Sequence, residues 1–333
     1  MQAAQLYKYD KNFKLKINEV PIPTPTANEV LVRVQFAAVN PLEQLIGTGK
    51  VRLIQDYVLP TTMGNELSGI ITAVGANVTD FRVGEAVYSR LPLNKIGAFA
   101  EFVAIDQRAV ALTPQNLDFA HSAAVPLTGL TAYQGLQEEL HVQPGERLLI
   151  PGGSGSFGQM AIPIAREMGL HVSVSGNARS KAAVLASGAT QYFDYRQENY
   201  WEKSAPVDAV IDTLGSKELS HELQIIKPGG KLLSLIMGPN RHFAQSHHLS
   251  WTKTALFSLA GARLDHQAKR VGAQYRFIFV RSDGAQLRKI TQLVEREGIV
   301  PAVDPTELRL ADINQALSLV ATGHHQGKVL IRL

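Results

Sequence analysis

The chain has 333 residues, of which 45% are hydrophobic and 19% are charged, and it contains no cysteine. This length and composition predict about two folded domains and exclude disorder and a coiled coil. The lack of cysteine excludes disulfide frameworks, thiolate zinc sites, iron–sulfur clusters and cysteine nucleophiles. The formal net charge of +4 comes without a clustered basic stripe, so we expect no nucleic-acid partner. Without a membrane-length apolar run or the apolar core of a signal peptide, we expect a cytoplasmic protein with no membrane contact.

Short strands separated by turns fill the first third of the chain. The Val-rich segment Glu29–Asn40 alternates apolar and polar residues at its start, as a half-buried strand does. Glycines at positions 64, 69, 75 and 84 punctuate the chain between short runs such as Gly69–Val74 and Glu85–Tyr88. Strands of this length with turn residues between them predict a small barrel-like β domain.

Apolar strands alternate with helical segments after residue 122. The helical pattern of Ser122–Leu140 comes first, and an amphipathic helix, Ala285–Glu297, precedes the closing strand Lys328–Arg332. Such alternation requires right-handed crossovers and predicts a mainly parallel sheet with helices on both faces. The strands predicted for this sheet are Arg147–Pro151, His171–Ser175, Asp208–Thr213, Lys231–Ile236 and Arg276–Val280.

A glycine-rich motif lies directly after the first of these strands. Gly153-Ser154-Gly155-Ser156-Phe157-Gly158 matches G-x-G-x-x-G and opens a predicted helix, Gln159–Met168. The glycines allow a tight turn and let backbone N–H groups approach a pyrophosphate at the positive end of that helix. The motif in this context therefore predicts a dinucleotide site rather than a glycine turn without a ligand.

The residues after the second strand indicate which dinucleotide binds. NAD sites place Asp or Glu about 20 residues past the first glycine. Here that window holds Ser175 and Asn177, and no acidic residue occurs between positions 167 and 194. Arg179 and Lys181 follow, where a 2′-phosphate needs donors and positive charge. We therefore expect NADP(H) bound by the glycine motif and these four residues, although either cation could instead be an ordinary solvated residue.

The order of motifs resembles that of the medium-chain dehydrogenase/reductase superfamily. A β domain is followed by Pro126–Tyr133 (PLTGLTAY), then by Gly152–Gly158, and the chain closes with Gly327–Arg332 (GKVLIR). The sequence is most similar to the zinc-free quinone oxidoreductase and enone reductase branch. The resemblance implies an α/β protein with a GroES-like β-rich catalytic domain, formed by residues 1–122 and 283–333. Residues 123–282 would form a Rossmann domain with a doubly wound parallel sheet, and relatives commonly form homodimers through its edge strand.

The resemblance also bears on zinc. In the alcohol dehydrogenase branch, three catalytic zinc ligands occupy the positions that Asn40, Asn65 and Leu127 hold in this chain. With all three replaced, we expect no metal site and no zinc-dependent alcohol oxidation.

The resemblance implies roles for several residues. Asn40 lies at the expected catalytic pocket and could donate to a substrate carbonyl or to the cofactor ribose, or could cap the following turn. Asn65 could polarise a carbonyl, or belong only to a turn. Thr128 would contact the nicotinamide side, Tyr195 would lie near the adenosine phosphate, and Lys328 would reach the cofactor or cap an exposed strand edge.

These expectations describe an NADPH-dependent oxidoreductase that transfers hydride, without zinc, to a quinone or to the activated C=C of an α,β-unsaturated carbonyl. Two alternatives remain open at this point. One is a 2-enoyl thioester reductase, and the other is a non-catalytic NADPH-binding protein.

Overall fold

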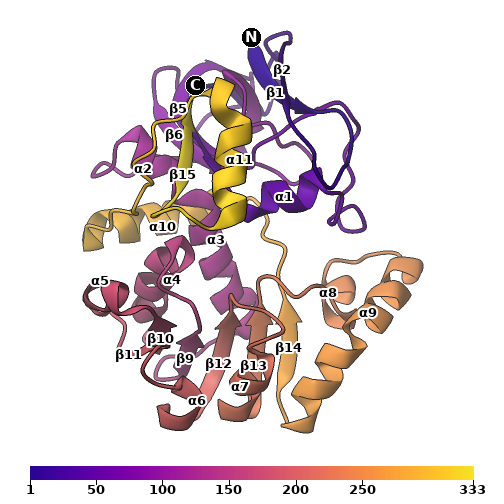
Figure 1. Ribbon diagram of the computed structural model, residues 1–333. Helices are drawn as coiled ribbons and strands as arrows, with labels where there is room; N and C mark the ends of the chain where they lie inside the picture. The colour runs from indigo at the N-terminus through magenta and orange to yellow at the C-terminus, as the bar shows by residue number, and fades with distance from the viewer. The chain divides into compact units, whose positions relative to one another are not determined.

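The computed structural model describes residues 1–333, which fold into two compact units (Figure 1). Unit 1 contains Met1–Leu130 and Arg281–Leu333, and unit 2 contains Thr131–Val280. Unit 1 therefore extends to Leu130, past the boundary expected at residue 122. None of the helices combines the length and apolar character that a membrane span requires.

Unit 1 is built on antiparallel strands, with β3 at the centre of its larger sheet. The order in that sheet is β15-β3-β5-β6-β8, with β7 also paired to β3, and a smaller sheet has the order β2-β1-β4. Pairing of β15 with β3 joins the end of the chain to its first part. The strands are β1 (Gln2–Leu6), β2 (Lys16–Glu19), β3 (Glu29–Val39), β4 (Thr61–Thr62), β5 (Glu66–Val74), β6 (Ala86–Arg90), β7 (Phe102–Asp106), β8 (Val110–Leu112) and β15 (Val329–Arg332).

The alternation of apolar and polar residues predicted for this segment is found in β3, which buries one of its two faces. Val30, Val32 and Val34 are each at most 2% exposed, because residues two apart on a strand share one face and that face packs into the core. Helices α2 (Phe119–Ala123), α10 (Gly284–Glu297) and α11 (Ile313–Thr322) pack on strands of this unit, and α1 (Pro41–Gly47) packs on α11. Helix α3 (Pro126–Gln134) begins in unit 1.

Unit 2 contains a six-stranded parallel sheet with the order β11-β10-β9-β12-β13-β14. This order reverses between β9 and β12, as in the doubly wound Rossmann fold, so the expected fold class is confirmed. The strands are β9 (Arg147–Ile150), β10 (His171–Gly176), β11 (Gln191–Asp194), β12 (Val207–Asp212), β13 (Ile226–Ser234) and β14 (Gln274–Phe277). The helices are α4 (Ser156–Glu167), α5 (Lys181–Ala186), α6 (Tyr200–Lys203), α7 (Leu219–Ile225), α8 (Arg241–Ser246) and α9 (Trp251–Arg270), with a π-helical turn at Gly135–Leu140.

Two predicted elements need correction, and one helix was not predicted. The helix predicted over Ser122–Leu140 is divided, because Pro126 has no N–H to continue the hydrogen bonding of α2 and instead begins α3. The last strand of the sheet is β14, Gln274–Phe277, rather than Arg276–Val280. The sequence analysis missed α9, because only Phe257, Gly261 and Ala268 of its 20 residues are buried and the apolar periodicity is weak.

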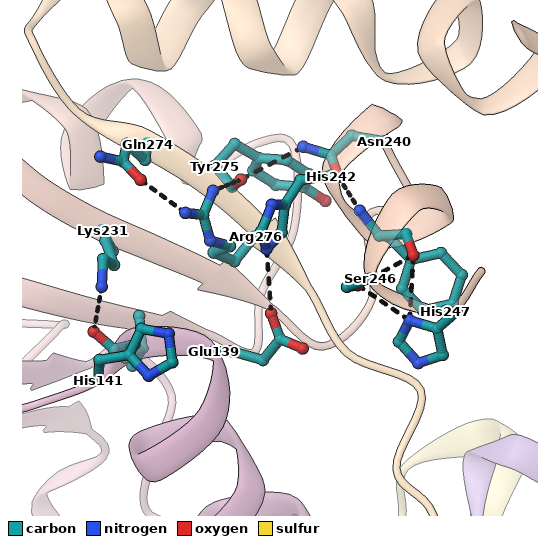
Figure 2. Close-up of polar contacts among 12 residues, drawn as sticks. Glu139, His141, Lys231, Asn240, His242, Ser246, His247, Gln274, Tyr275 and Arg276 are labelled. Carbon is teal, nitrogen blue, oxygen red and sulfur yellow. Dashed lines mark hydrogen bonds and ion pairs between the residues drawn. The ribbon is translucent and has the colours of Figure 1, made fainter. Parts of the chain in front are cut away.

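Side chains join α8 to the edge strand β14 (Figure 2). Asn240 caps α8, since its Oδ1 accepts the N–H of Phe243 at 3.0 Å, and its Nδ2 donates to the Tyr275 carbonyl at 3.3 Å. Arg276 Nη1 donates to the same carbonyl at 3.3 Å. This carbonyl of the edge strand is therefore hydrogen-bonded within unit 2.

Candidate active site and cofactor-binding loop

Asn40 lies where β3 ends and α1 begins, and it is 3% exposed. Its backbone N–H donates to Glu43 Oε2 at 2.7 Å, as in a capping box. Its side-chain Nδ2 donates to Glu66 Oε1 at 3.0 Å and to the Ala38 carbonyl at 3.3 Å. The amide is therefore held by a carboxylate from the neighbouring strand β5.

Glu43 also binds the second candidate residue, Asn65. Asn65 Nδ2 donates to Glu43 Oε1 at 2.7 Å, whereas the buried Asn65 Oδ1 has no hydrogen-bond partner. Burial raises the pKa of Glu43 to about 7, although the hydrogen bonds from Asn65 and Asn40 act in the opposite direction. Glu43 was not among the residues expected in the site, yet its carboxyl holds the side-chain amide of Asn65 and the backbone N–H of Asn40.

Glu66 connects Asn40 to Lys328. Lys328 Nζ lies 2.7 Å from Glu66 Oε1, and the two side chains are 4% and 0% exposed. Glu66 Oε2 accepts the backbone N–H of Leu127 at 2.7 Å. Lys328 is thus a buried ion-pair partner rather than a cap on an exposed strand edge. Asn40, Asn65 and Leu127 stand at the three positions of the zinc ligands. Each of them donates a hydrogen bond to Glu43 or to Glu66.

Arg90 ends β6 and is also fully buried. Its Nη1 donates to the Leu91 carbonyl, while its Nε and Nη2 have no partner. Burial lowers the pKa of its guanidinium to about 10. Arg90 was not predicted from the sequence. The signal that could have pointed to it is a cation at the end of a mostly apolar strand. We call Asn40, Glu43, Asn65, Glu66, Arg90 and Lys328 the polar centre.

Zinc does not fit the polar centre. Zinc in proteins prefers thiolate, imidazole or carboxylate ligands, and the expected positions offer two amides and a leucine. The two carboxylates are already bonded to Asn40, Asn65 and Lys328. Lys328 and Arg90 would also repel a dication there. No group of three His, Cys, Asp or Glu side chains in the 333 described residues could hold a metal ion.

The glycine motif of unit 2 joins β9 to α4. A Cβ on Gly158 would lie 1.7 Å from the Gly153 carbonyl oxygen, so only glycine lets the helix pack this close to the turn. A Cβ on Gly155, which precedes α4, would meet no atom within 4 Å. The first N–H groups of α4, from Ser156 and Phe157 onward, have no partner within the helix. This loop fits the pyrophosphate of a dinucleotide.

Ser175 and Asn177 lie beside the glycine motif, at the carboxyl end of β10. Ser175 Oγ accepts the Gly152 N–H at 3.2 Å and ties the motif to β10. The Asn177 carbonyl accepts a hydrogen bond from Tyr192 on the neighbouring strand β11 at 2.5 Å. Both residues thus help to fix the ends of β10 and β11. The adenosine end of the cofactor is expected to lie beside these two strand ends.

Exposed cations follow these strand ends. Arg179 and Lys181 are exposed beyond β10. After β11, Tyr195 is 59% exposed, and the Arg196 guanidinium lies 5.8 Å from its ring centroid. Arg196 is a third cation that the sequence analysis did not select. These side chains can supply donors and charge to a phosphate.

Thr128 lies in unit 1, in helix α3. Its hydroxyl donates to the carbonyls of Ala124 at 3.2 Å and Val125 at 3.3 Å, and the residue is 6% exposed. Thr128 is therefore not part of the polar centre. The other predicted residues form two groups, with Asn40, Asn65 and Lys328 in the polar centre of unit 1, and the glycine motif with the strand-end residues in unit 2.

Comparison with known proteins agrees with this architecture. The family described as "Alcohol dehydrogenase GroES-like domain" matches residues 26–115, and that described as "Zinc-binding dehydrogenase" matches residues 187–331. The quinone oxidoreductase of Homo sapiens is 31% identical over 241 residues, covering 70% of this chain and 72% of that protein. The NADPH-dependent alkenal/one oxidoreductase of Arabidopsis thaliana is 28% identical over 327 residues, covering 96% and 75%.

A solved structure is similar over the whole chain. An alcohol dehydrogenase superfamily protein from Novosphingobium aromaticivorans has a TM-score of 0.84 and 27% identity, and the alignment covers 100% of this chain and 99% of that one. The fold and the sites thus define an oxidoreductase that uses a nicotinamide cofactor. The chain belongs to the medium-chain dehydrogenase/reductase superfamily, in its zinc-free quinone oxidoreductase branch.

Proposed function

We propose that this chain is an NADPH-dependent reductase that transfers hydride, without zinc, to a quinone or to the activated C=C of an α,β-unsaturated carbonyl. The observation that carries this proposal is the polar centre, where amides and a guanidinium stand at and beside the positions of zinc ligands. Hydrogen-bond donors can stabilise developing oxyanion charge without a metal. The names of the quinone and alkenal/one oxidoreductases cited above support the same acceptor classes.

The cofactor would be held by unit 2. Backbone N–H groups at the start of α4 would bind the pyrophosphate, and Ser175 and Asn177 would line the ribose. Arg179 and Lys181 would bind the 2′-phosphate, with Tyr195 beside the adenosine. NADPH bound there would supply a hydride, which carries the two electrons of the reduction, and would become NADP⁺.

The polar centre would then orient the acceptor. Glu43 and Glu66 fix the Asn65 and Asn40 amides, so that little reorganisation is needed when charge develops. In reduction of an enone, a C–H bond forms at the β-carbon and the C=C electron pair moves toward oxygen. The resulting enolate takes a proton from water at the α-carbon, which balances the two-electron reduction.

Three further assignments belong to this proposal. The catalytic domain, expected at residues 1–122 and 283–333, would correspond to unit 1, and the cofactor domain, expected at residues 123–282, would correspond to unit 2. Thr128 and Lys328 would lie on the nicotinamide side of the cofactor. The protein would work in the cytoplasm as a homodimer on a small-molecule acceptor.

A panel assay tests this function. NADPH oxidation would be followed with 9,10-phenanthrenequinone, with an enone such as 3-nonen-2-one, and with crotonyl-CoA. Turnover of the quinone or the enone, above any turnover of crotonyl-CoA, is the expected result. Selective use of the thioester would favour an enoyl thioester reductase, and binding of NADPH without any turnover would indicate a non-catalytic protein.

A further inference from the structure

Arg90 is the one cation of the polar centre that is not paired with a carboxylate, since Lys328 is bonded to Glu66. The β5–β6 register pairs Arg90 with Glu66, so the two side chains share a face of the sheet. Arg90 is 0% exposed. Its guanidinium bonds to the Leu91 carbonyl through Nη1, and its buried Nε and Nη2 have no partner. One edge of the guanidinium therefore remains available.

Both nearby carboxylates use their oxygens elsewhere. Glu43 accepts from Asn65 Nδ2 and from the Asn40 backbone, each at 2.7 Å. Glu66 accepts from Asn40 Nδ2 at 3.0 Å and lies 2.7 Å from Lys328 Nζ. The carboxylates of Glu43 and Glu66 and the cations of Lys328 and Arg90 are all buried. Neither carboxylate, however, accepts a hydrogen bond from Arg90. Arg90 thus stays unpaired although two carboxylates are buried in the same region.

Two further buried polar atoms of this region also lack a partner. They are the Tyr57 hydroxyl and Asn65 Oδ1. The charge of Arg90 lowers the pKa of the Tyr57 hydroxyl, against the larger effect of burial, which raises it to about 12. Leaving buried donors and charges unsatisfied destabilises a fold. Groups in such environments are concentrated at functional sites.

We propose that Arg90 is a catalytic residue that binds the carbonyl or quinone oxygen of the acceptor through Nε and Nη2. This inference rests on the proposed function and names the group that performs part of it. A planar guanidinium edge with two N–H donors matches an oxygen that gains negative charge. Arg90 thus takes the electrostatic role that zinc has where its ligands are present. It stays protonated throughout, so the proton of the product comes from water.

Tyr57 lies near enough to Arg90 for the guanidinium charge to act on its hydroxyl. The residues of the polar centre are all buried, whereas the Tyr57 side chain is half-buried. Its backbone N–H donates to the Tyr9 hydroxyl at 3.0 Å, and that hydroxyl donates to Asp56 at 2.9 Å. The Tyr57 segment is therefore fastened to the N-terminal part of unit 1 by a few polar contacts at the surface.

The test compares Arg90→Met with Arg82→Met, which replaces an exposed arginine of the same unit. Arg90→Met should lower kcat/KM for the enone by about 100-fold, with NADPH affinity unchanged. Its melting temperature should be equal to or higher than that of the wild type, because a hydrophobic side chain replaces an unpaired buried charge. Arg82→Met should match the wild type in all three measurements.

A binding measurement separates this inference from the proposed function. Line broadening of 4-fluorobenzoate in ¹⁹F NMR, with NADP⁺ present, reports a carboxylate at the guanidinium and needs no turnover. The wild type and Arg82→Met should bind it, and Arg90→Met should not. If no acceptor is reduced but this pattern holds, the function fails and the Arg90 site stands.

Equal 4-fluorobenzoate binding and equal kcat/KM for wild type and Arg90→Met would overturn the Arg90 inference and leave the function standing. A lowered melting temperature with normal kinetics would make Arg90 structural. Should Arg90→Met fail to fold, Arg90→Lys keeps the charge but loses the two-donor edge. That variant should still show weaker 4-fluorobenzoate binding, and wild-type binding by it would contradict the proposal.

Discussion

Glu43 binds Asn65 at 2.7 Å through one carboxyl oxygen and the backbone of Asn40 at 2.7 Å through the other. Asn40, which follows β3, and Asn65, which precedes β5, are thus joined by one side chain of α1, through a backbone N–H and a side-chain amide respectively. The side-chain amide of Asn40 is held instead by Glu66. The link through Glu43 makes the positions of Asn40 and Asn65 depend on a carboxyl whose pKa is raised to about 7.

The first prediction concerns Asn40. Asn40→Ala should lower turnover of an enone while leaving NADPH affinity intact, because both N–H groups of the Asn40 amide are donated to Glu66 and the Ala38 carbonyl and so hold the geometry of the polar centre. Asn40→Asp should be worse, since it sets a carboxylate against Glu66 Oε1, which accepts from Asn40 Nδ2 at 3.0 Å. Turnover, NADPH affinity and melting temperature of both variants provide the check. A fully active and stable Asp variant would make Asn40 a turn residue only.

The second prediction concerns cofactor preference. Arg179→Ala combined with Lys181→Ala should weaken NADPH binding far more than NADH binding, because each charged hydrogen bond to a phosphate contributes about 1.5–3 kcal/mol. Fluorescence titration with both cofactors measures this. Lys269→Ala with Arg270→Ala, two exposed cations at the end of α9, is the matched control. Equal losses for NADPH and NADH would show that Arg179 and Lys181 do not read the 2′-phosphate.

The third prediction is that activity does not depend on a metal. Dialysis against a chelator should leave enone or quinone reduction unchanged, because the expected ligand positions hold Asn40, Asn65 and Leu127. Elemental analysis should find no stoichiometric zinc in the purified protein. Activity that is lost on chelation and restored only by zinc would contradict the account of the polar centre.

The fourth prediction concerns Glu222 in α7, which is 0% exposed. Neither of its carboxyl oxygens has a hydrogen-bond partner, and burial raises its pKa to about 10, with Asp212 adding to the shift. Since the folded pKa exceeds the unfolded one, the unfolded state releases this proton first. The contribution of Glu222 to stability is therefore present below about pH 4.5 and is lost progressively as the pH rises toward 10.

Glu222→Gln should remove this loss. The variant should be at least about 1 kcal/mol more stable than the wild type at pH 8 and nearly equal to it at pH 4.5. Urea unfolding at both pH values measures the difference. A variant that is less stable at pH 8 would show that the carboxyl makes a favourable interaction that Gln cannot replace.

Local signals predicted the structure around the glycine motif well. A short apolar strand, the glycines at 153, 155 and 158, and a following helix are all contiguous in sequence, and their geometry depends mainly on neighbouring residues. The strand at the sheet edge was less well placed. Phe277, Ile278 and Val280 are all buried, so an apolar run continues where the strand pairing has already stopped.

The polar centre could be predicted only in part. Asn40 and Asn65 were found by their positions relative to the motifs, but their partners come from distant segments. Lys328 meets Glu66 only because β15 returns to pair with β3. Arg90 meets the same carboxylate only through the register of β5 with β6. Long-range pairing of this kind sets the electrostatics of the site, and a single sequence does not reveal it.

The central claim is NADPH-dependent reduction of a quinone or an enone. Its most direct test is the steady-state rate of the purified wild type with NADPH and with NADH, using 9,10-phenanthrenequinone and 3-nonen-2-one as acceptors. The account predicts turnover of at least one acceptor, with kcat/KM about 10-fold or more higher for NADPH than for NADH, as one charged phosphate contact provides. A preference for NADH, or the absence of turnover with both acceptors, would contradict it.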